Sequence, residues 1–157
     1  MSVTYRLARP EDLGHAHRML AQLALDDGGV TIKGTAETLR HLTGLPNAWL
    51  RVLLAIRDTQ PIGVATFQPE YSSYRGCAGT FIPDLYVAPD TRGLGVGRGL
   101  IRAVLQHSQD WGSAYISLHV HDFNETARAF YARTGFVVRE SGDYLILEGK
   151  ALDDLCV

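Results

Sequence analysis

The residues best suited to chemistry form one glycine-rich stretch near the middle of the chain. It begins at Arg92, runs through Gly93-Leu94-Gly95-Val96-Gly97-Arg98, and is followed by Gly99. Glycines let backbone N–H groups come close to a ligand, because no Cβ stands in the way. Where such a stretch opens a helix, its unpaired N–H donors and the helix dipole both favour an anion. Together with the positive charges of Arg92 and Arg98, this pattern predicts a phosphate site.

The elements on either side of the stretch support this interpretation. An apolar, β-prone run from Phe81 to Val87 precedes it, and helically spaced apolar residues follow at Leu100, Ile101, Val104 and Leu105. The sequence therefore predicts a strand, a glycine-rich turn and then a helix. A flexible loop between two ordinary elements is the alternative.

The glycine spacing excludes two common phosphate loops. The dinucleotide pattern G-x-G-x-x-G is absent, because its sixth position is Arg98 counted from Gly93 and Leu100 counted from Gly95. A nucleoside-triphosphate loop ends in Gly-Lys-Ser/Thr, and this stretch holds no lysine. The pattern that fits is Arg-x-x-Gly-x-Gly, from position 92 to position 97. It resembles the acyl-CoA pyrophosphate loop of the Gcn5-related N-acetyltransferases.

A second segment resembles the same family. The family's N-x-x-A-x-x-F-Y-x-[RK]-x-G-F pattern is similar to the run from Asn124 to Phe136, with Ala127 and Tyr131 at the matching positions. Asn124 and Tyr131 are seven residues apart, so on a helix they share a face and stand about 10 Å apart along the axis. That separation suits an extended pantetheine arm, with Asn124 at an amide and Tyr131 at the sulfur.

The resemblance implies acetyl-CoA as cosubstrate and no metal. It places the pyrophosphate on the backbone N–H groups from Gly93 to Arg98. It places the pantetheine and the thioester carbonyl on the N–H groups of a bulged strand end. The residues that it assigns to CoA are Leu85, Tyr86, Val87, Arg92, Gly93, Leu94, Gly95, Val96, Gly97, Arg98, Asn124, Ala127 and Tyr131.

Transfer of an acetyl group to an amine needs a neutral amine, a donor for the oxyanion and a proton for the leaving thiolate. The resemblance assigns the last role to Tyr131, and an aromatic ring packing beside Phe130 is the alternative. Asp84 lies on the strand beside the expected thioester and is the candidate general base. A carboxylate tied to nearby backbone or to an arginine is the alternative for Asp84.

Within the family, the chain resembles the diamine (spermidine/spermine) acetyltransferases. The likeness includes the run Gly63–Phe67, the Tyr-Ser-x-x-x-Gly run that starts at Tyr71, and the tail from Leu145 to Leu152. The diamine group carries an acid pair before the CoA strand, and this chain has Pro83 and Asp84 there. The likeness implies a homodimer and a small primary amine as acceptor: a polyamine, a lysine analogue or an amino acid.

Other acceptors and other functions stay open. The carboxylates expected to attract a cationic amine are Asp26, Asp27, Glu70 and Asp84. A protein lysine or N-terminal acetyltransferase is one alternative, and a non-catalytic acyl-CoA-binding module is another. His119 and His121 alternate at a strand end without a third metal ligand, so we expect no metal.

Composition fits this class of protein. A chain of 157 residues predicts a single domain over residues 1–157. A net charge of −2 argues against non-specific nucleic-acid binding. The two cysteines, Cys77 and Cys156, match no metal or redox spacing. The sequence has no apolar run of membrane-spanning length and no apolar leader, so we expect a cytoplasmic protein without membrane contact.

Periodicity predicts the remaining elements. Strands are expected at 3–8, 49–56, 62–67, 81–87, 114–120, 136–138 and 144–147, and helices at 10–25, 35–43, 100–109 and 124–133. A loop is expected at 69–79. This order indicates an α+β (mixed α/β) fold of the Gcn5-related type. Its sheet is expected to be mixed and largely antiparallel, with about six to seven strands and about four flanking helices.

Overall fold

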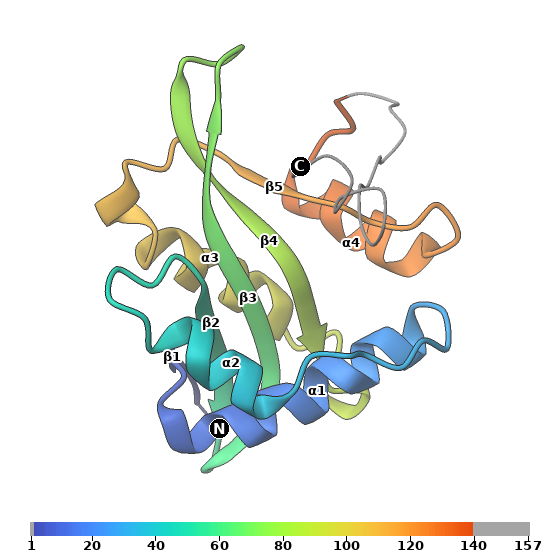
Figure 1. The fold of residues 1–157 in the computed structure, drawn as a ribbon. Helices are drawn as coiled ribbons and strands as arrows, with labels where there is room; N and C mark the ends of the chain where they lie inside the picture. Colours follow the sequence, from blue (N-terminus) through green and yellow to red (C-terminus); the bar gives the residue numbers. More distant parts are fainter. Residues whose placement is uncertain (1, 140–157) are drawn as a thin grey trace, which may run out of the picture. The chain divides into compact units, whose positions relative to one another are not determined.

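One five-stranded sheet organises the first part of the chain (Figure 1). The computed structural model describes residues 2–139 and divides the chain into two units, Met1–Glu125 and Thr126–Val157. The strands lie in sequence order: β1 (Val3–Leu7), β2 (Arg51–Arg57), β3 (Gln60–Ser72), β4 (Cys77–Val87) and β5 (Ile116–Leu118). The pairs from β1 to β4 are antiparallel, and β5 is parallel to β4. The α+β class and the mixed, largely antiparallel sheet are confirmed.

The strand count differs from the prediction. Among residues 2–139 the sheet has five strands, not six to seven. Residues 136–138 form no strand, and the side chains of Val137 and Val138 are largely exposed instead of alternating between a buried and an open face. The strand expected at 144–147 and the similar tail at 145–152 lie outside the described residues.

The loop expected at 69–79 is wrong, because β3 and β4 continue as a paired hairpin. Tyr71 pairs with Ala78, and the turn occupies only residues 73–76. The run after Phe67 is polar and contains a proline, so its sequence did not indicate a strand. β2 begins opposite Phe67, so beyond that point β3 is paired only with β4 in the described sheet. A proline such as Pro69 is tolerated in a strand that has one edge unpaired.

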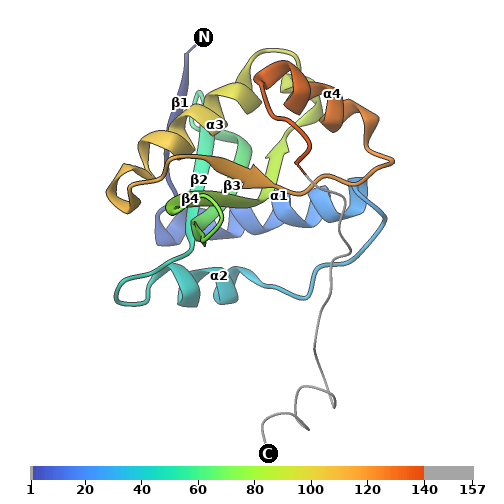
Figure 2. The ribbon, with the colours of Figure 1, turned by 90° about the horizontal axis from the view of Figure 1, so that it is seen from above.

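Helices cover both faces of this sheet (Figure 2). A short turn η1 (Pro10–Asp12) leads into α1 (Leu13–Asp26), and α2 (Ala36–Thr43) follows on the same side. The other side carries α3 (Val96–Gln106). The predicted apolar stripe of α1 is buried at Leu13, Ala16 and Leu20. Thr35 caps α2, because its hydroxyl accepts from the backbone N–H of Thr38 at 3.1 Å.

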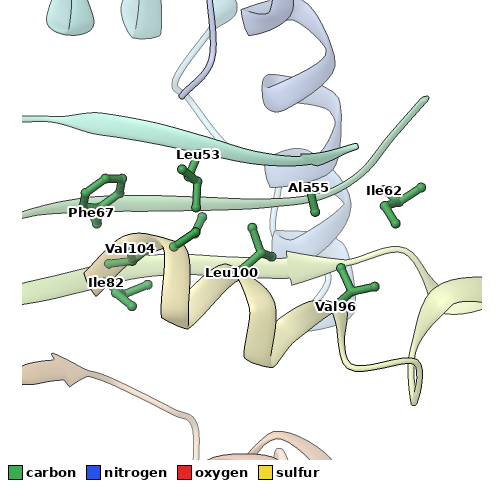
Figure 3. Close-up of a cluster of buried hydrophobic side chains, with 10 residues drawn as sticks. Leu53, Ala55, Ile62, Phe67, Ile82, Val96, Leu100 and Val104 are labelled. Atoms are coloured by element: carbon green, nitrogen blue, oxygen red, sulfur yellow. The ribbon is translucent and has the colours of Figure 1, made fainter. Parts of the chain in front are cut away.

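Two apolar clusters hold the layers together. Under α1 lie side chains of the three central strands: Val52, Leu54, Val64 and Tyr86. Under α3, a stripe of helix residues points at the sheet (Figure 3): Val96, Leu100 and Val104 meet Leu53, Phe67 and Ile82. A Cβ on Gly99 would lie 2.0 Å from the hydroxyl oxygen of Tyr5. Gly99 therefore lets α3 approach β1 closely.

Shorter elements complete the first unit. Two single turns, η2 (Pro89–Thr91) and η3 (Gln109–Trp111), flank α3. The helix expected to reach residue 109 ends at Gln106. Beyond that point the buried Ser108 hydroxyl donates to the Val104 carbonyl at 2.6 Å, a side-chain bond that competes with helical ones. None of the helices in the described ranges is both long and apolar enough to cross a membrane.

The last helix, α4 (Glu125–Thr134), lies largely in the second unit. Gly135 ends it with a φ of +104°, the left-handed conformation predicted for a glycine at that position. Within this unit, the Tyr131 ring lies 5.2 Å from the Phe130 ring and 5.5 Å from the Phe136 ring, centroid to centroid. The predicted helix at 124–133 is thus confirmed to within one residue at each end.

Candidate acetyl-transfer site

A bulge divides β4 just before the residues predicted to meet the thioester. Thr66 pairs with Asp84 and Gln68 pairs with Phe81, so two steps along β3 match three steps along β4. The extra residue falls around Pro83, which has no N–H to donate and is tolerated at such a point. The bulge expected at this strand end is therefore present.

The bulge decides which side chains of β4 meet which helix. Ile82 and Leu85 both pack against the cluster under α3, although regular alternation would turn residues three apart to opposite faces. Asp84 faces Thr66, and Tyr86 packs in the cluster under α1. The face that carries α1 therefore receives a carboxylate and a phenol from the end of β4.

One edge of β4 is unpaired past the bulge. β5 pairs with β4 only from Thr80 to Ile82, and within the described part of the first unit no strand pairs with that edge from Pro83 onward. Backbone N–H and C=O groups along such an edge need other partners. The predicted CoA-binding residues Leu85, Tyr86 and Val87 lie in this stretch.

Asp84 is the titratable group at the bulge. The Thr66 hydroxyl donates to its Oδ2 at 2.5 Å. Burial raises the pKa of the Asp84 carboxyl above its ordinary range, and the bond from Thr66 opposes that rise. A carboxylate with a raised pKa is a better proton acceptor than an ordinary one. The alternative for Asp84 was a carboxylate tied to nearby backbone or to an arginine. Among residues 2–139, Asp84 forms no salt bridge with an arginine.

The glycine-rich loop follows β4 and η2 directly. Gly93 and Gly95 have φ angles of +79° and +82°, the left-handed region in which glycine is favoured. A Cβ added to either would meet no atom within 4 Å, so the open space and the backbone angle both point to a loop that exposes its backbone. The two glycines turn the chain from the strand into α3.

The first turn of α3 has the features of an anion site. The N–H of Gly99 is the first to bond within the helix, to the Gly95 carbonyl at 3.0 Å. The N–H groups of Val96, Gly97 and Arg98 therefore precede the first helical bond, and no side chain caps the helix. Arg98 is exposed beside them. These N–H groups can donate to phosphate oxygens.

The end of α1 contacts two of the residues predicted to bind CoA. The Arg92 guanidinium donates from Nε to the Val87 carbonyl at 2.9 Å and from Nη2 to Asp26 Oδ2 at 3.1 Å. The amide of Gln22, and then the Arg92 guanidinium, hold the pKa of Asp26 below its usual range. The Asn124 amide donates to Asp27 Oδ1 at 2.8 Å. Asp26 and Asp27 thus fix side chains of the predicted cosubstrate site.

Residues 17–136 match the model of a known family, described as the Acetyltransferase (GNAT) family. The chain belongs to this family. It is an N-acetyltransferase, and the cosubstrate of GNAT acetyltransferases is acetyl-CoA.

Individual relatives agree with this assignment. The thialysine N-epsilon-acetyltransferase of Sus scrofa is 28% identical over 169 residues, which cover 98% of this chain and 97% of the relative. The enzyme of that name from Bos taurus is 29% identical, with 98% and 96% covered. An integron cassette protein from the mobile metagenome of V. cholerae has the same fold, with a TM-score of 0.79 at 21% identity over 99% of this chain and 98% of that one.

The residues of this GNAT chain fit an acyl-CoA pyrophosphate. The uncapped first turn of α3, the two left-handed glycines and the exposed Arg98 together offer donors and positive charge. Among residues 2–139, no group of three or more His, Cys, Asp or Glu side chains could hold a metal ion. The first unit thus carries the predicted loop and Asp84, and Ala127 and Tyr131 belong to the second unit.

Sequence reasoning missed part of the candidate site of this acetyltransferase. Thr66, the hydrogen-bond partner of Asp84, was not predicted, because the pairing of the two strands depends on where the hairpin turns. Of the four carboxylates expected to attract an amine, Asp26 and Asp27 contact other site residues instead. Glu70 is held on β3 by the Ser117 hydroxyl at 2.6 Å.

Proposed function

We propose that this protein transfers an acetyl group from acetyl-CoA directly to a primary amine of a small molecule. The observation that most supports this proposal is the loop of left-handed glycines that opens α3 soon after the bulge in β4. Polyamines, lysine analogues and amino acids are the acceptor classes that fit. The names of the relatives, which describe thialysine N-epsilon-acetyltransferases, support a lysine analogue.

The reaction sets a proton requirement that side chains must meet. Acetyl-CoA supplies an acetyl thioester. A C–N bond to the amine forms and the C–S bond breaks, so the protonated amine gives up two protons and the leaving sulfur takes one. The enzyme therefore needs a group that accepts protons from the amine and a group that gives a proton to the thiolate.

Asp84 and Tyr131 are proposed for these two roles. The raised pKa of Asp84 and its place on the face of β4 that carries α1 support its role as the base. Tyr131 is proposed as the acid from the match to the family pattern. A Tyr hydroxyl has an ordinary pKa of about 10 and a thiol about 8.5, so this proton transfer needs help from the surroundings.

Release of free thiol from acetyl-CoA, measured with a panel of polyamines, lysine analogues and amino acids, tests the proposal. We expect release with one class of amine and direct binding of CoA by calorimetry. CoA binding without release by any small amine would favour a protein acceptor or a non-catalytic binding module. Absence of CoA binding would refute the interpretation of the loop.

The proposed acid can be tested separately. Tyr131→Phe should lower kcat by about a hundredfold, within the usual range for a general acid. Tyr74→Phe is the matched control, because Tyr74 is fully exposed on the hairpin turn. An unchanged kcat in Tyr131→Phe would remove the acid role. The homodimer implied by the family resemblance is tested by light scattering at micromolar concentration.

A further inference from the structure

A second polar group lies on the β3–β4 hairpin, away from the glycine-rich loop. Glu70 on β3 pairs with Gly79 on β4, and on the other side of β4 the Thr80 N–H bonds to the carbonyl of Tyr115 at 2.9 Å. A Cβ on Gly79 would lie 2.3 Å from the Tyr115 ring. The ring therefore lies across the bare backbone of Gly79, toward β3.

Glu70 is held in place at the end of that ring. The Ser117 hydroxyl donates to Glu70 Oε1 at 2.6 Å, so the carboxylate reaches across β4 to the residues just before and within β5. Burial, and then the Glu70 charge, raise the pKa of the Tyr115 hydroxyl and keep it protonated. An ionised carboxylate has about four acceptor positions, so Glu70 can accept from a ligand while it keeps the Ser117 bond.

A positive charge lies over the same ring. The Arg75 guanidinium carbon is 4.9 Å from the centre of the Tyr115 ring. Arg75 forms no salt bridge with any carboxylate in the described part of the chain. Tyr115 thus has a fixed carboxylate beside it and an available guanidinium above it. That combination matches the two charges of an α-amino acid head group.

This group shares a face of the sheet with Asp84. Thr66, whose hydroxyl bonds to Asp84, and Glu70 are both even-numbered positions of β3, and alternate residues of a strand point to the same side. They are four positions apart along the strand, which is a distance of about 13 Å. A ligand lying along β3 on this face can meet Asp84 at one end and Glu70 at the other.

We propose that Glu70 and Arg75 bind the α-ammonium and the α-carboxylate of a lysine-like amino acid whose terminal amine reaches Asp84. This assignment rests on the proposed function. Extended chain advances about 3.5 Å per three bonds, so the six bonds from Nζ to the α-nitrogen of lysine span about 7 Å. A hydrogen bond of about 3 Å at each end brings the total to about 13 Å, which matches the separation along β3.

Three acceptors that differ in their head groups test the contact of Glu70 and the contact of Arg75 separately. Lysine carries both head-group charges, cadaverine lacks the carboxylate, and 6-aminohexanoate lacks the α-amine. Arg75→Ala should lower kcat/KM about tenfold for lysine and for 6-aminohexanoate and leave cadaverine unchanged. Glu70→Gln should lower kcat/KM similarly for lysine and cadaverine and leave 6-aminohexanoate unchanged.

The controls distinguish this pattern from general damage. Arg9→Ala and Glu11→Gln change an exposed arginine and an exposed glutamate near the start of the chain, and should leave all three acceptors unaffected. Arg75 is exposed on a turn, so its replacement tests the assignment even if Glu70→Gln unfolds the hairpin. Equal loss for all three acceptors in Arg75→Ala would overturn the proposal.

The failure of this proposal differs from a failure of the proposed function. If a polyamine is acetylated efficiently and Arg75→Ala changes no acceptor's kcat/KM, the enzyme is an amine acetyltransferase and the head-group site is refuted. If no amine drives thiol release from acetyl-CoA, the proposed function itself fails. Lysine-dependent release of thiol, together with the opposite selectivity changes expected for Arg75→Ala and Glu70→Gln, would support both the proposed function and the head-group site.

Discussion

Replacing Gly95 by alanine isolates the contribution of the left-handed backbone at the start of α3. Gly95 has a φ of +82°, and a Cβ there would meet no atom within 4 Å, so the substitution changes the backbone energy without a clash. That conformation costs an L-residue about 1–2 kcal/mol. The unfolded chain of the alanine variant has less conformational entropy to lose on folding, which offsets about 0.4–1 kcal/mol of this cost. We therefore expect a net loss of about 1 kcal/mol.

The loss can appear in two places, and both must be measured. If the loop keeps its shape, the free energy of unfolding falls by about 1 kcal/mol, and Tm falls by about 3 °C for a chain of this size. If the loop relaxes instead, the free energy of unfolding changes less, and the binding of CoA must restore the shape of the loop. The dissociation constant for CoA then rises by up to about fivefold. Urea unfolding and calorimetric CoA titration give the two quantities.

Two further variants make the result decisive. Gly112 has a φ of +65° with equal open space and lies after η3, so Gly112→Ala should cost similar stability and leave CoA affinity unchanged. Gly95→Asn should recover much of the loss, because asparagine tolerates the left-handed region. If Gly95→Ala kept both the wild-type unfolding free energy and the wild-type CoA affinity, the reasoning about this loop would be refuted.

Two other features of the sheet give separate predictions. Asp84→Asn should raise the free energy of unfolding at neutral pH, because burial raises the pKa of Asp84 and makes its charged form unfavourable in the fold. Wild-type stability from this group is present below the ordinary Asp pKa of about 3.9 and is lost as the pH rises through the folded-state pKa. The gain of the variant should therefore disappear in acid, and urea unfolding that gave equal stabilities at pH 7 would contradict this account. Thr66→Val removes the bond that opposes the rise, so the acidic limb of kcat/KM should move to higher pH; a limb that stayed in place would exclude Asp84 as the base. Gly79→Ala should displace the Tyr115 ring and lower the free energy of unfolding by about 1–3 kcal/mol, and the added change Tyr115→Ala should recover part of it. Full stability of the single variant in thermal unfolding would show that the ring does not need the bare backbone.

Local patterns predicted the parts of the structure that depend on neighbours in sequence. The loop from position 92 to 98, the helix after it and the glycine that ends α4 are of this kind. The sequence also suggested a common role for the glycines of the loop, but in the structure these glycines have different roles. Gly93 and Gly95 have the left-handed backbone, whereas Gly99 is needed because α3 lies against Tyr5.

Features that depend on strand pairing could not be predicted in the same way. The partner of Asp84 is fixed by a hairpin turn at residues 73–76, and the polar run of β3 concealed that turn. The contact of Arg75 and Glu70 with Tyr115 and Ser117 joins segments some forty residues apart, as the separation of 47 between Glu70 and Ser117 shows. No local periodicity carries such information.

The bulge in β4 also sets how this chain can tolerate change. The extra residue around Pro83 reverses the parity of the strand: before it, Ile82 faces α3, and after it, Leu85 faces α3 as well. Deleting Pro83 would restore the regular alternation, with Ile82 and Leu85 still facing α3 and Asp84 still facing α1. A change of length by one residue can therefore be absorbed at the bulge, whereas the same change farther along β4 would exchange every later side chain between the two faces of the sheet.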